Sequence, residues 1–283
     1  MESQVHELGA GDAPASRYRE FAPPPALARA LVCSWTQIIG DGPSSYAQRV
    51  LPDGCVDLVW LGDQPPSAVG PSTAPFVARL RPRTEVVGIR FRPGWAPSII
   101  GAPASELLDR NVALVDLWGR AADALADPVL ERPSPAARLA AIEEVLRARW
   151  LRARPADPMI TAAVAWLARH PSARVDRLAA ELRVSPRHLH RRFAEAVGYG
   201  PKTFQRVARF QRLLGLGAGA RRAGDGLSQL ALDAGYADQA HMTREVRRLA
   251  GRTPAAMVGV AGTTLALSDL FKTESDGRGA LEP

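Results

Sequence analysis

The alternation of apolar and polar positions divides the chain into a first part of short strands and a second part of helices. Between residues 31 and 91, short runs rich in β-branched and aromatic residues are separated by clusters of Gly, Pro and Asp. This arrangement is typical of antiparallel strands joined by turns, and it predicts a small sheet or barrel. The predicted strands are Leu31–Ile39, Tyr46–Leu51, Cys55–Leu61, Phe76–Leu80 and Glu85–Phe91.

Farther along the chain, the apolar positions recur every three or four residues, which predicts amphipathic helices. A proline-rich segment at residues 154–158 favours extended backbone and predicts a linker, and a glycine-rich segment at residues 215–226 predicts a second break. The predicted helices are Pro103–Asp109, Leu114–Ala126, Pro135–Arg152, Met159–Arg169, Val175–Leu182, Pro201–Leu216 and Leu227–Ala234, with a last short one from Pro254.

A near-duplicate pattern occurs twice in the helical part, 53 residues apart. Ser185 and Asp238 can each cap the start of a helix, and Gly198 and Gly251 suit its end. The apolar stripe between them consists of Leu189, Phe193 and Val197 in one copy and of Met242, Val246 and Leu249 in the other. A short helix with one buried stripe and an outward face of Arg, His, Gln and Thr has the size and chemistry to enter a DNA major groove.

Positive charge is concentrated in the segment that holds the duplicated pattern. Residues 157–260 contain 17 Lys and Arg against 8 Asp and Glu, whereas residues 1–156 contain 17 of each. Phosphate neutralisation supplies most of the sequence-independent affinity for nucleic acid, so this asymmetry indicates a nucleic-acid-binding domain. Only Lys202 and Lys272 are lysines among the 36 basic residues. An arginine-rich genome explains that preference, but it does not explain why the first part is neutral.

The composition argues against secretion, membrane insertion and metal chemistry. No basic segment followed by an apolar run opens the chain, and no apolar stretch reaches the roughly 18 residues of a transmembrane helix. Cys33 and Cys55 lie in apolar runs without a C-x-x-C spacing, so we expect free thiols in a cytoplasmic protein. Only His6 precedes His170 among the five histidines, and no nucleotide-binding or nucleophile motif is visible. We therefore expect no cofactor, no metal and no enzymatic activity.

Residues 158–260 resemble the AraC/XylS family of bacterial transcription regulators. The resemblance rests on residues 178–182, 185–193, 230–236, 241–244 and 247–254, together with Gly198, Pro201 and Asp238. It implies two tandem helix-turn-helix units joined by one amphipathic helix, although Val246 stands where the family usually has phenylalanine. Residues 51–60 and 88–94 resemble an uncharacterised domain that often precedes such regulators. That second resemblance implies a sensor or dimerisation role.

Together these patterns predict an α+β protein. An N-terminal β-rich domain, a small sheet or barrel plus helices, is followed by an all-α domain with two helix-turn-helix units. We expect an effector-binding or dimerisation domain over residues 1–132, a connecting helix and linker over 133–156, an AraC-type DNA-binding domain over 157–260 and a disordered tail over 261–283. Before Tyr18 the chain is expected to be loosely ordered, because it is polar and rich in Pro and Ala.

The outward faces of the duplicated helices supply candidate DNA contacts. Arginine can bond guanine O6 and N7 together, glutamine suits adenine, and threonine can bond a base or touch a thymine methyl group. The candidate base contacts are Arg187, His190, Arg191, Gln239, Thr243 and Arg244. Side chains near helix starts are expected to hold phosphates and fix the register. These candidates are Ser185, His188, Lys202, Arg206, His241 and Arg252. For each of them, the alternative is an ordinary solvated side chain.

The candidate effector-binding residues are polar or aromatic groups near strand ends, namely Asp57, Trp60, Arg90 and Arg92. The alternative is a turn carboxylate with aromatic side chains of the core. We predict a sequence-specific transcription regulator, one subunit of which reads adjacent major-groove segments under the control of a small molecule. Its expected partners are double-stranded DNA, a small-molecule effector, RNA polymerase and a second copy in a homodimer, but no membrane. The other hypotheses are a constitutive DNA-binding protein whose first domain only dimerises, and an enzyme fused to a helix-turn-helix domain.

Overall fold

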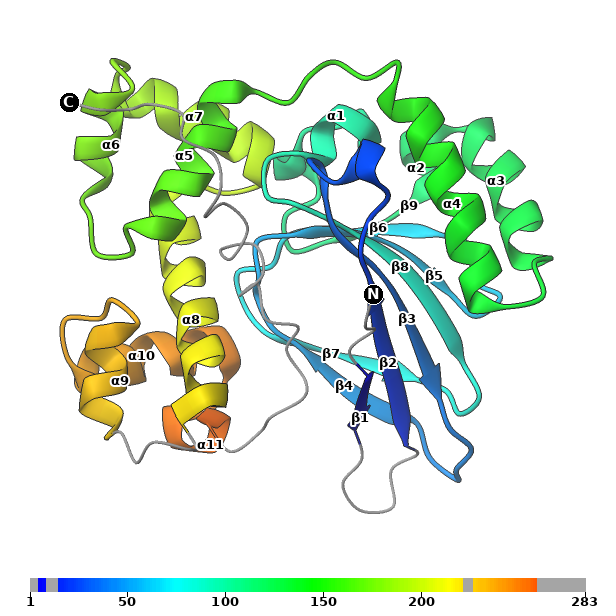
Figure 1. The fold of residues 1–283 in the computed structure, drawn as a ribbon, viewed down its shortest axis with the longest axis horizontal. Coiled ribbons are helices and arrows are strands. Elements are labelled where there is room, and N and C mark those ends of the chain that lie inside the picture. The colour runs from blue at the N-terminus through cyan, green and yellow to red at the C-terminus, as the bar shows by residue number, and fades with distance from the viewer. Residues whose placement is uncertain (1–4, 9–14, 221–225, 259–283) are drawn as a thin grey trace.

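The computed structural model describes residues 5–8, 15–220 and 226–258. Strands dominate the first part of the chain and helices the second (Figure 1). The strands are β1 (Val5–Leu8), β2 (Ser16–Phe21), β3 (Leu31–Ile39), β4 (Tyr46–Val50), β5 (Val56–Leu61), β6 (Ser67–Val69), β7 (Phe76–Leu80), β8 (Glu85–Phe91) and β9 (Asn111–Ala113).

Within the described residues, the strands form a seven-stranded sheet and a separate two-stranded ribbon. The sheet order is β1-β2-β3-β8-β5-β6-β9, the ribbon pairs β4 with β7, and every pairing is antiparallel. Because side chains alternate along a strand, Leu58 and Ile89 face the helices on one side of the sheet. On the other side, Trp35 packs with Tyr46 and Leu80 of the ribbon.

Helices cover one face of the seven-stranded sheet, where Figure 1 shows α2, α3 and α4 side by side. These segments are η1 (Pro25–Leu27), α1 (Ala96–Ile100), η2 (Ala104–Glu106), α2 (Leu114–Trp118), α3 (Arg120–Leu130) and α4 (Pro135–Trp150). Ser134 caps α4 by accepting a hydrogen bond from the amide of Ala137 at 3.2 Å. Leu139, Ile142 and Leu146 follow at helical spacing and are buried in the core of the sheet. The apolar stripe of α4 therefore packs within the N-terminal domain.

The rest of the described chain is helical. The elements are α5 (Pro158–Arg169), α6 (Val175–Glu181), α7 (Pro186–Val197), α8 (Pro201–Ala220), α9 (Leu227–Asp233), α10 (Gln239–Ala250) and α11 (Pro254–Val258). With 20 residues, α8 is about 30 Å long, and it runs from the group of α5, α6 and α7 to the group of α9, α10 and α11 (Figure 1). No helix in the described part of the chain has the length and apolar composition needed to cross a membrane.

The predicted fold class is confirmed, and most predicted elements lie within two residues of the observed ones. Several expectations were wrong. The segment before Tyr18 contains β1 and the start of β2, and Ser16 and Tyr18 turn inward where β2 pairs with β3. The helix predicted at 103–109 is only the three-residue η2, and the one predicted at 114–126 is interrupted at Gly119, whose φ is +56°.

The glycine-rich break was also placed too early, since α8 continues to Ala220. The remainder of that expected break, at residues 221–225, and the expected tail at 261–283 lie outside the described residues. The domain boundaries stay predictions.

Candidate nucleic-acid interface

The first helix-turn-helix unit consists of α6 and α7. The turn after α6 places Arg183 in the left-handed region, with φ of +53°. Ser185 then caps α7, its hydroxyl oxygen accepting a hydrogen bond from the amide of His188 at 3.2 Å. The side of α7 that packs on its neighbours consists of Leu189, Phe193 and Val197, each at most 1% exposed. The predicted cap and stripe are therefore confirmed.

The second unit, α9 and α10, repeats this construction with a longer turn. Gly235 takes the left-handed position, with φ of +91°, and the carboxylate of Asp238 accepts from the amide of His241 at 2.6 Å. Two positions separate Arg183 from Ser185, whereas three separate Gly235 from Asp238, as the sequence predicts. The buried stripe of α10 is Met242, Val246 and Leu249.

The polar faces of α7 and α10 lie outside the core. The side chains of Arg187, His190, Arg191, Gln239 and Arg244 are exposed, and that of Thr243 is half-buried. Arg191 pairs with Glu195 one turn further along α7, at 3.0 Å, but such exposed pairs contribute little and are easily exchanged for another partner. Thr243 donates to the backbone carbonyl of Gln239 at 2.8 Å. All six candidates are accessible from solvent, and their contact with bases stays a prediction.

The candidate phosphate contacts do not all share this accessibility. Lys202 and Arg252 are exposed, whereas Arg206 is largely buried and forms an ion pair with Glu245 of α10. The expectation that Arg206 holds a phosphate is therefore corrected, because its guanidinium already has a carboxylate partner inside the domain. His241 is also engaged internally, since its Nδ1 accepts from the amide of Ala237 at 3.3 Å.

Two family matches agree with this architecture. Residues 178–258 match the family described as a helix-turn-helix domain, and residues 19–113 match a domain of unknown function (DUF6597). Residues 178–258 therefore form a helix-turn-helix domain of the AraC type, and the chain is a DNA-binding regulator. The match over residues 178–258 runs from within α6 to the end of α11, and the match over residues 19–113 runs from within β2 to the end of β9 and includes the ribbon.

Solved structures of ToxT from Vibrio cholerae are similar to the regulator over much of both chains. One at 1.65 Å resolution has a TM-score of 0.40 and 12% identity, covering 77% of the regulator and 99% of ToxT. An apo variant of ToxT has a TM-score of 0.41 and 12% identity, covering 93% and 97%. ToxT bound to an unsaturated fatty acid has a TM-score of 0.38 and 11% identity, covering 78% and 99%. Values this low do not establish a shared function. No curated protein sequence matches the regulator.

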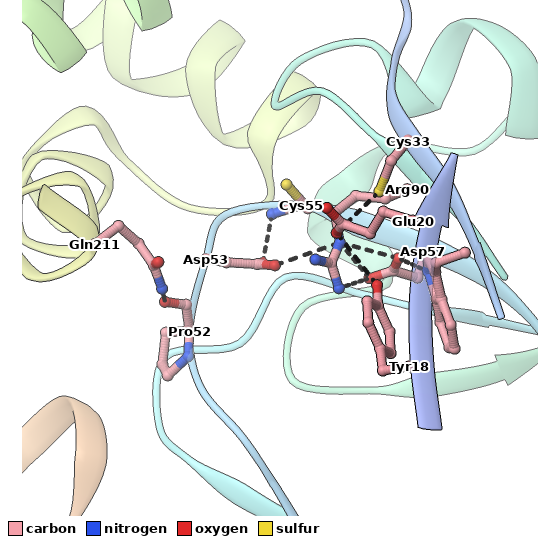
Figure 2. A network of polar contacts seen from close by, with 10 residues as sticks. Tyr18, Glu20, Cys33, Pro52, Asp53, Cys55, Asp57, Arg90 and Gln211 are labelled. Carbon is pink, nitrogen blue, oxygen red and sulfur yellow. Dashed lines mark hydrogen bonds and ion pairs between the residues drawn. The ribbon is translucent and has the colours of Figure 1, made fainter. Parts of the chain in front are cut away.

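In the N-terminal domain, Arg90 forms the centre of a buried ionic cluster on the ribbon side of the sheet (Figure 2). Asp57 lies directly opposite it in the pairing of β5 with β8. The Nε atom of Arg90 is 3.1 Å from Asp57 Oδ1 and 3.6 Å from Asp53 Oδ2. The indole Nε1 of Trp35 donates to Asp57 Oδ1 at 3.0 Å. Only glycine at position 88 permits this, because a Cβ on Gly88 would lie 2.2 Å from the indole ring.

The cluster contains more acidic groups than basic ones. Glu20 lies beside it and accepts a hydrogen bond from the thiol of Cys33 at 3.4 Å. Burial opposes the charge of Arg90, but Asp57 and Asp53 together raise its pKa well above the ordinary value. Burial also raises the pKa of Asp53, with Arg90 acting in the opposite direction. Arg90 therefore stays charged, and the buried carboxylate of Asp53 depends on Arg90 to keep its negative charge.

The structure brings two of the four candidate effector residues together. Asp57 and Arg90 form the ion pair, and the Nε of Arg92 donates to the backbone carbonyl of Ala28 at 3.2 Å. Trp60 does not belong to this group. It is three positions from Asp57 on β5, so strand alternation places it on the opposite face, where it is 1% exposed in the core under the helices. The expectation that Trp60 lines the same site is corrected.

The loop between β4 and β5 joins this cluster to the helical domain, and no pattern in the sequence predicts this contact. The side-chain amide of Gln211 on α8 donates to the backbone carbonyl of Pro52 at 2.6 Å, and the contact is buried (Figure 2). Gly54 has φ of +83°, and a Cβ there would lie 3.2 Å from Tyr199 Oη and 3.3 Å from the ring of Phe204. Loop and helix are therefore in direct contact.

Two further contacts connect the N-terminal domain to the ends of the recognition helices. A Cβ on Gly198, which ends α7, would lie 2.5 Å from the ring of Pro71. At the end of α10, the guanidinium of Arg49 donates to the carbonyl of Ala250 at 3.4 Å. The N-terminal domain thus touches α8 and the C-terminal ends of both α7 and α10.

Proposed function

We propose that the regulator recognises specific double-stranded DNA by placing α7 and α10 in adjacent major-groove segments about 34 Å apart. The observation that carries this proposal is the pair of capped helices with accessible polar faces, one near each end of the continuous α8. A stiff α8 fixes the separation of the two helices, which favours a bent site. The regulator acts by binding, without a catalytic step.

Within this proposal, the six accessible side chains on α7 and α10 contact bases. They are Arg187, His190, Arg191, Gln239, Thr243 and Arg244. Groups at helix starts and flanks contact phosphates and set the register. They are Ser185, His188, Lys202, His241 and Arg252. Arg206 is left out of this set because Glu245 neutralises it.

Replacing a base-contacting arginine tests the proposal. Arg244→Ala or Arg191→Ala should weaken binding at the specific site by about 1–3 kcal/mol and relax base preference at one position, because a bidentate contact to guanine is lost. Binding is measured by fluorescence anisotropy on the preferred site, found by selection from random duplexes, and on random DNA. Equal losses on both DNAs would contradict base readout by that residue.

Lys202→Ala separates phosphate contact from base contact. Removing one phosphate contact should weaken all sequences alike and reduce the slope of log affinity against log salt by about one charge. Lys202 is exposed near the start of α8, so its removal leaves the core intact. An unchanged salt slope would exclude Lys202 from the phosphate contacts.

We propose further that a small molecule bound by the N-terminal domain modulates DNA binding. The support comes from three consecutive residues. Asp53 is an ion partner of Arg90, and its neighbours Pro52 and Gly54 both touch α8. A ligand that shifts the Arg90 cluster would shift Pro52 and Gly54 with it. We also propose that the regulator forms a homodimer and contacts RNA polymerase, and that these contacts link DNA binding to transcription. The apolar stripe of α4 is not the dimer interface, since it packs on the sheet.

A further inference from the structure

The two recognition helices carry opposite charges at one matched position, and each of these charges is paired outside its own helix-turn-helix unit. With the 53-residue offset, Arg192 of α7 corresponds to Glu245 of α10. Arg192 pairs with Asp157 at the start of α5, and Glu245 pairs with Arg206 of α8. The repeat therefore keeps an ion pair at this position while reversing its polarity and changing its partner helix.

The pair on α10 is largely buried, with side-chain exposures of 17% for Arg206 and 16% for Glu245. Glu245 immediately follows Arg244, a candidate base contact, on the same helical turn. A fixed link between Glu245 and α8 therefore fixes the rotation of α10 about its axis, and with it the direction of Arg244. Buried ion pairs contribute little net stability and are favourable only with good geometry. The Arg206–Glu245 pair is therefore better suited to orienting α10 than to stabilising the fold.

The pair on α7 is built differently but has the same effect. Asp157 has two partners: one carboxylate oxygen accepts from the amide of Met159 and caps α5 at 3.1 Å, and the other lies 2.7 Å from the guanidinium of Arg192. Arg192 follows Arg191, another candidate base contact, in the chain. The first recognition helix is thus tied to the start of α5, directly after the segment that connects the two domains.

We propose that Glu245 and Arg192 are positioning residues that set base preference without touching DNA, each for its own half of the site. Through Arg206, Glu245 orients the face of α10; through Asp157, Arg192 orients the face of α7. Hydrogen bonds to base edges form only within narrow limits of distance and angle. Breaking either ion pair should therefore reduce the preference for the correct base more than it reduces the sequence-independent affinity for phosphates. The inference rests on the proposed DNA readout by the two helices.

Two conservative substitutions remove one anchor each. Glu245→Gln keeps the size of the side chain and loses its charge, while Asp157→Asn keeps a good helix cap and loses its charge toward Arg192. The matched control is Glu181→Gln, which makes the same charge change at an exposed pair with Arg177 on α6. Because the three substitutions raise the net charge equally, differences between them do not come from general attraction to phosphate.

The readout is the base-preference profile of the full chain, measured by selection from random duplexes and by binding to specific and random DNA. We expect Glu245→Gln to lower the ratio of specific to random affinity about tenfold, equivalent to about 1.4 kcal/mol, with relaxed preference only in the half contacted by α10. Asp157→Asn should relax only the other half, and Glu181→Gln neither. The exchange Arg206→Glu with Glu245→Arg should restore part of the preference.

The positioning role would be overturned if a single substitution reduced base preference equally in both halves of the DNA site, or if the profile were unchanged from that of the wild type. If Arg244→Ala relaxes the profile and Glu245→Gln does not, DNA readout by α10 stands and the positioning role fails. A wild-type protein without any base preference would overturn both the readout and the positioning. Unfolding curves of each variant show whether a change in profile accompanies a loss of folding.

Discussion

Gly54 offers a direct measurement of how strongly the N-terminal domain acts on the DNA-binding domain. Its φ of +83° lies in the region that favours glycine, so Gly54→Ala costs roughly 1–2 kcal/mol of folding free energy from the backbone alone. The added methyl group would also lie 3.2 Å from Tyr199 Oη and 3.3 Å from Phe204. Overpacking of this kind adds about 1–3 kcal/mol, and this second part acts on Tyr199 between α7 and α8 and on Phe204 within α8.

Gly101 provides the matched control, because its φ is +84° and a Cβ there would have no atom within 4 Å. Gly101→Ala should therefore carry the backbone cost without the contact between domains. Chemical unfolding and DNA-binding anisotropy of both full-length variants separate the two parts. We expect both to lose stability and only Gly54→Ala to change DNA affinity, within the roughly 5–150-fold range of such couplings. Equal DNA affinities for the two variants would refute control of DNA binding through this loop.

Two predictions concern folding. Burial raises the pKa of the Cys33 and Cys55 thiols well above their ordinary value, so the folded chain keeps protons that the unfolded chain releases above about pH 8.5. Stability should then fall with rising pH by up to about 1.4 kcal/mol per unit for each thiol; unfolding curves at pH 7–10 test this, and replacing both thiols by alanine should flatten the decline. Asp238→Ala should cost about 1 kcal/mol in denaturant unfolding and Asp238→Asn much less, because asparagine also caps; equal losses would argue against capping.

Local sequence patterns were sufficient to predict the elements that carry the recognition helices. Caps such as Ser185 and Asp238 act on amides three residues away, and the buried stripes recur within one or two turns, so both leave a signature in a short window of sequence. Five of the strands were found for the same reason, whereas β1, β2, β6 and β9 were missed. β6 and β9 have only three residues each, too few to show an alternation, and β2 has a different cause. The inward residues of β2, Ser16 and Tyr18, are polar or amphipathic, so its alternation does not resemble that of a half-buried strand.

Contacts between distant parts of the chain left no such signature. Arg206 and Glu245 are 39 residues apart, and Gln211 and Pro52 are 159 residues apart. The phosphate role was expected for Arg206 because it is a basic residue near a helix start, and nothing local in the sequence indicates its carboxylate partner 39 residues away. The prediction that Trp60 lines the effector site was wrong for a different reason. A position near a strand end does not indicate which face of the sheet a side chain occupies, whereas the spacing of three residues from Asp57 indicates opposite faces.

Contacts of three kinds determine how α7 and α10 lie relative to each other: the continuous α8, the ion pairs of Arg192 and Glu245, and the loops of the N-terminal domain. The first two lie within the helical domain, and in our proposal they set the DNA sequence that it prefers. Only the third depends on the N-terminal sheet, so a ligand near Arg90 can act on DNA binding through it. Linkage makes this action reciprocal, so DNA changes the affinity for the ligand by the same factor. A coupling of about 1–3 kcal/mol is typical, and overpacking at Gly54 is expected to cost a similar amount, so Gly54→Ala is a large enough perturbation to reveal the proposed coupling through this loop.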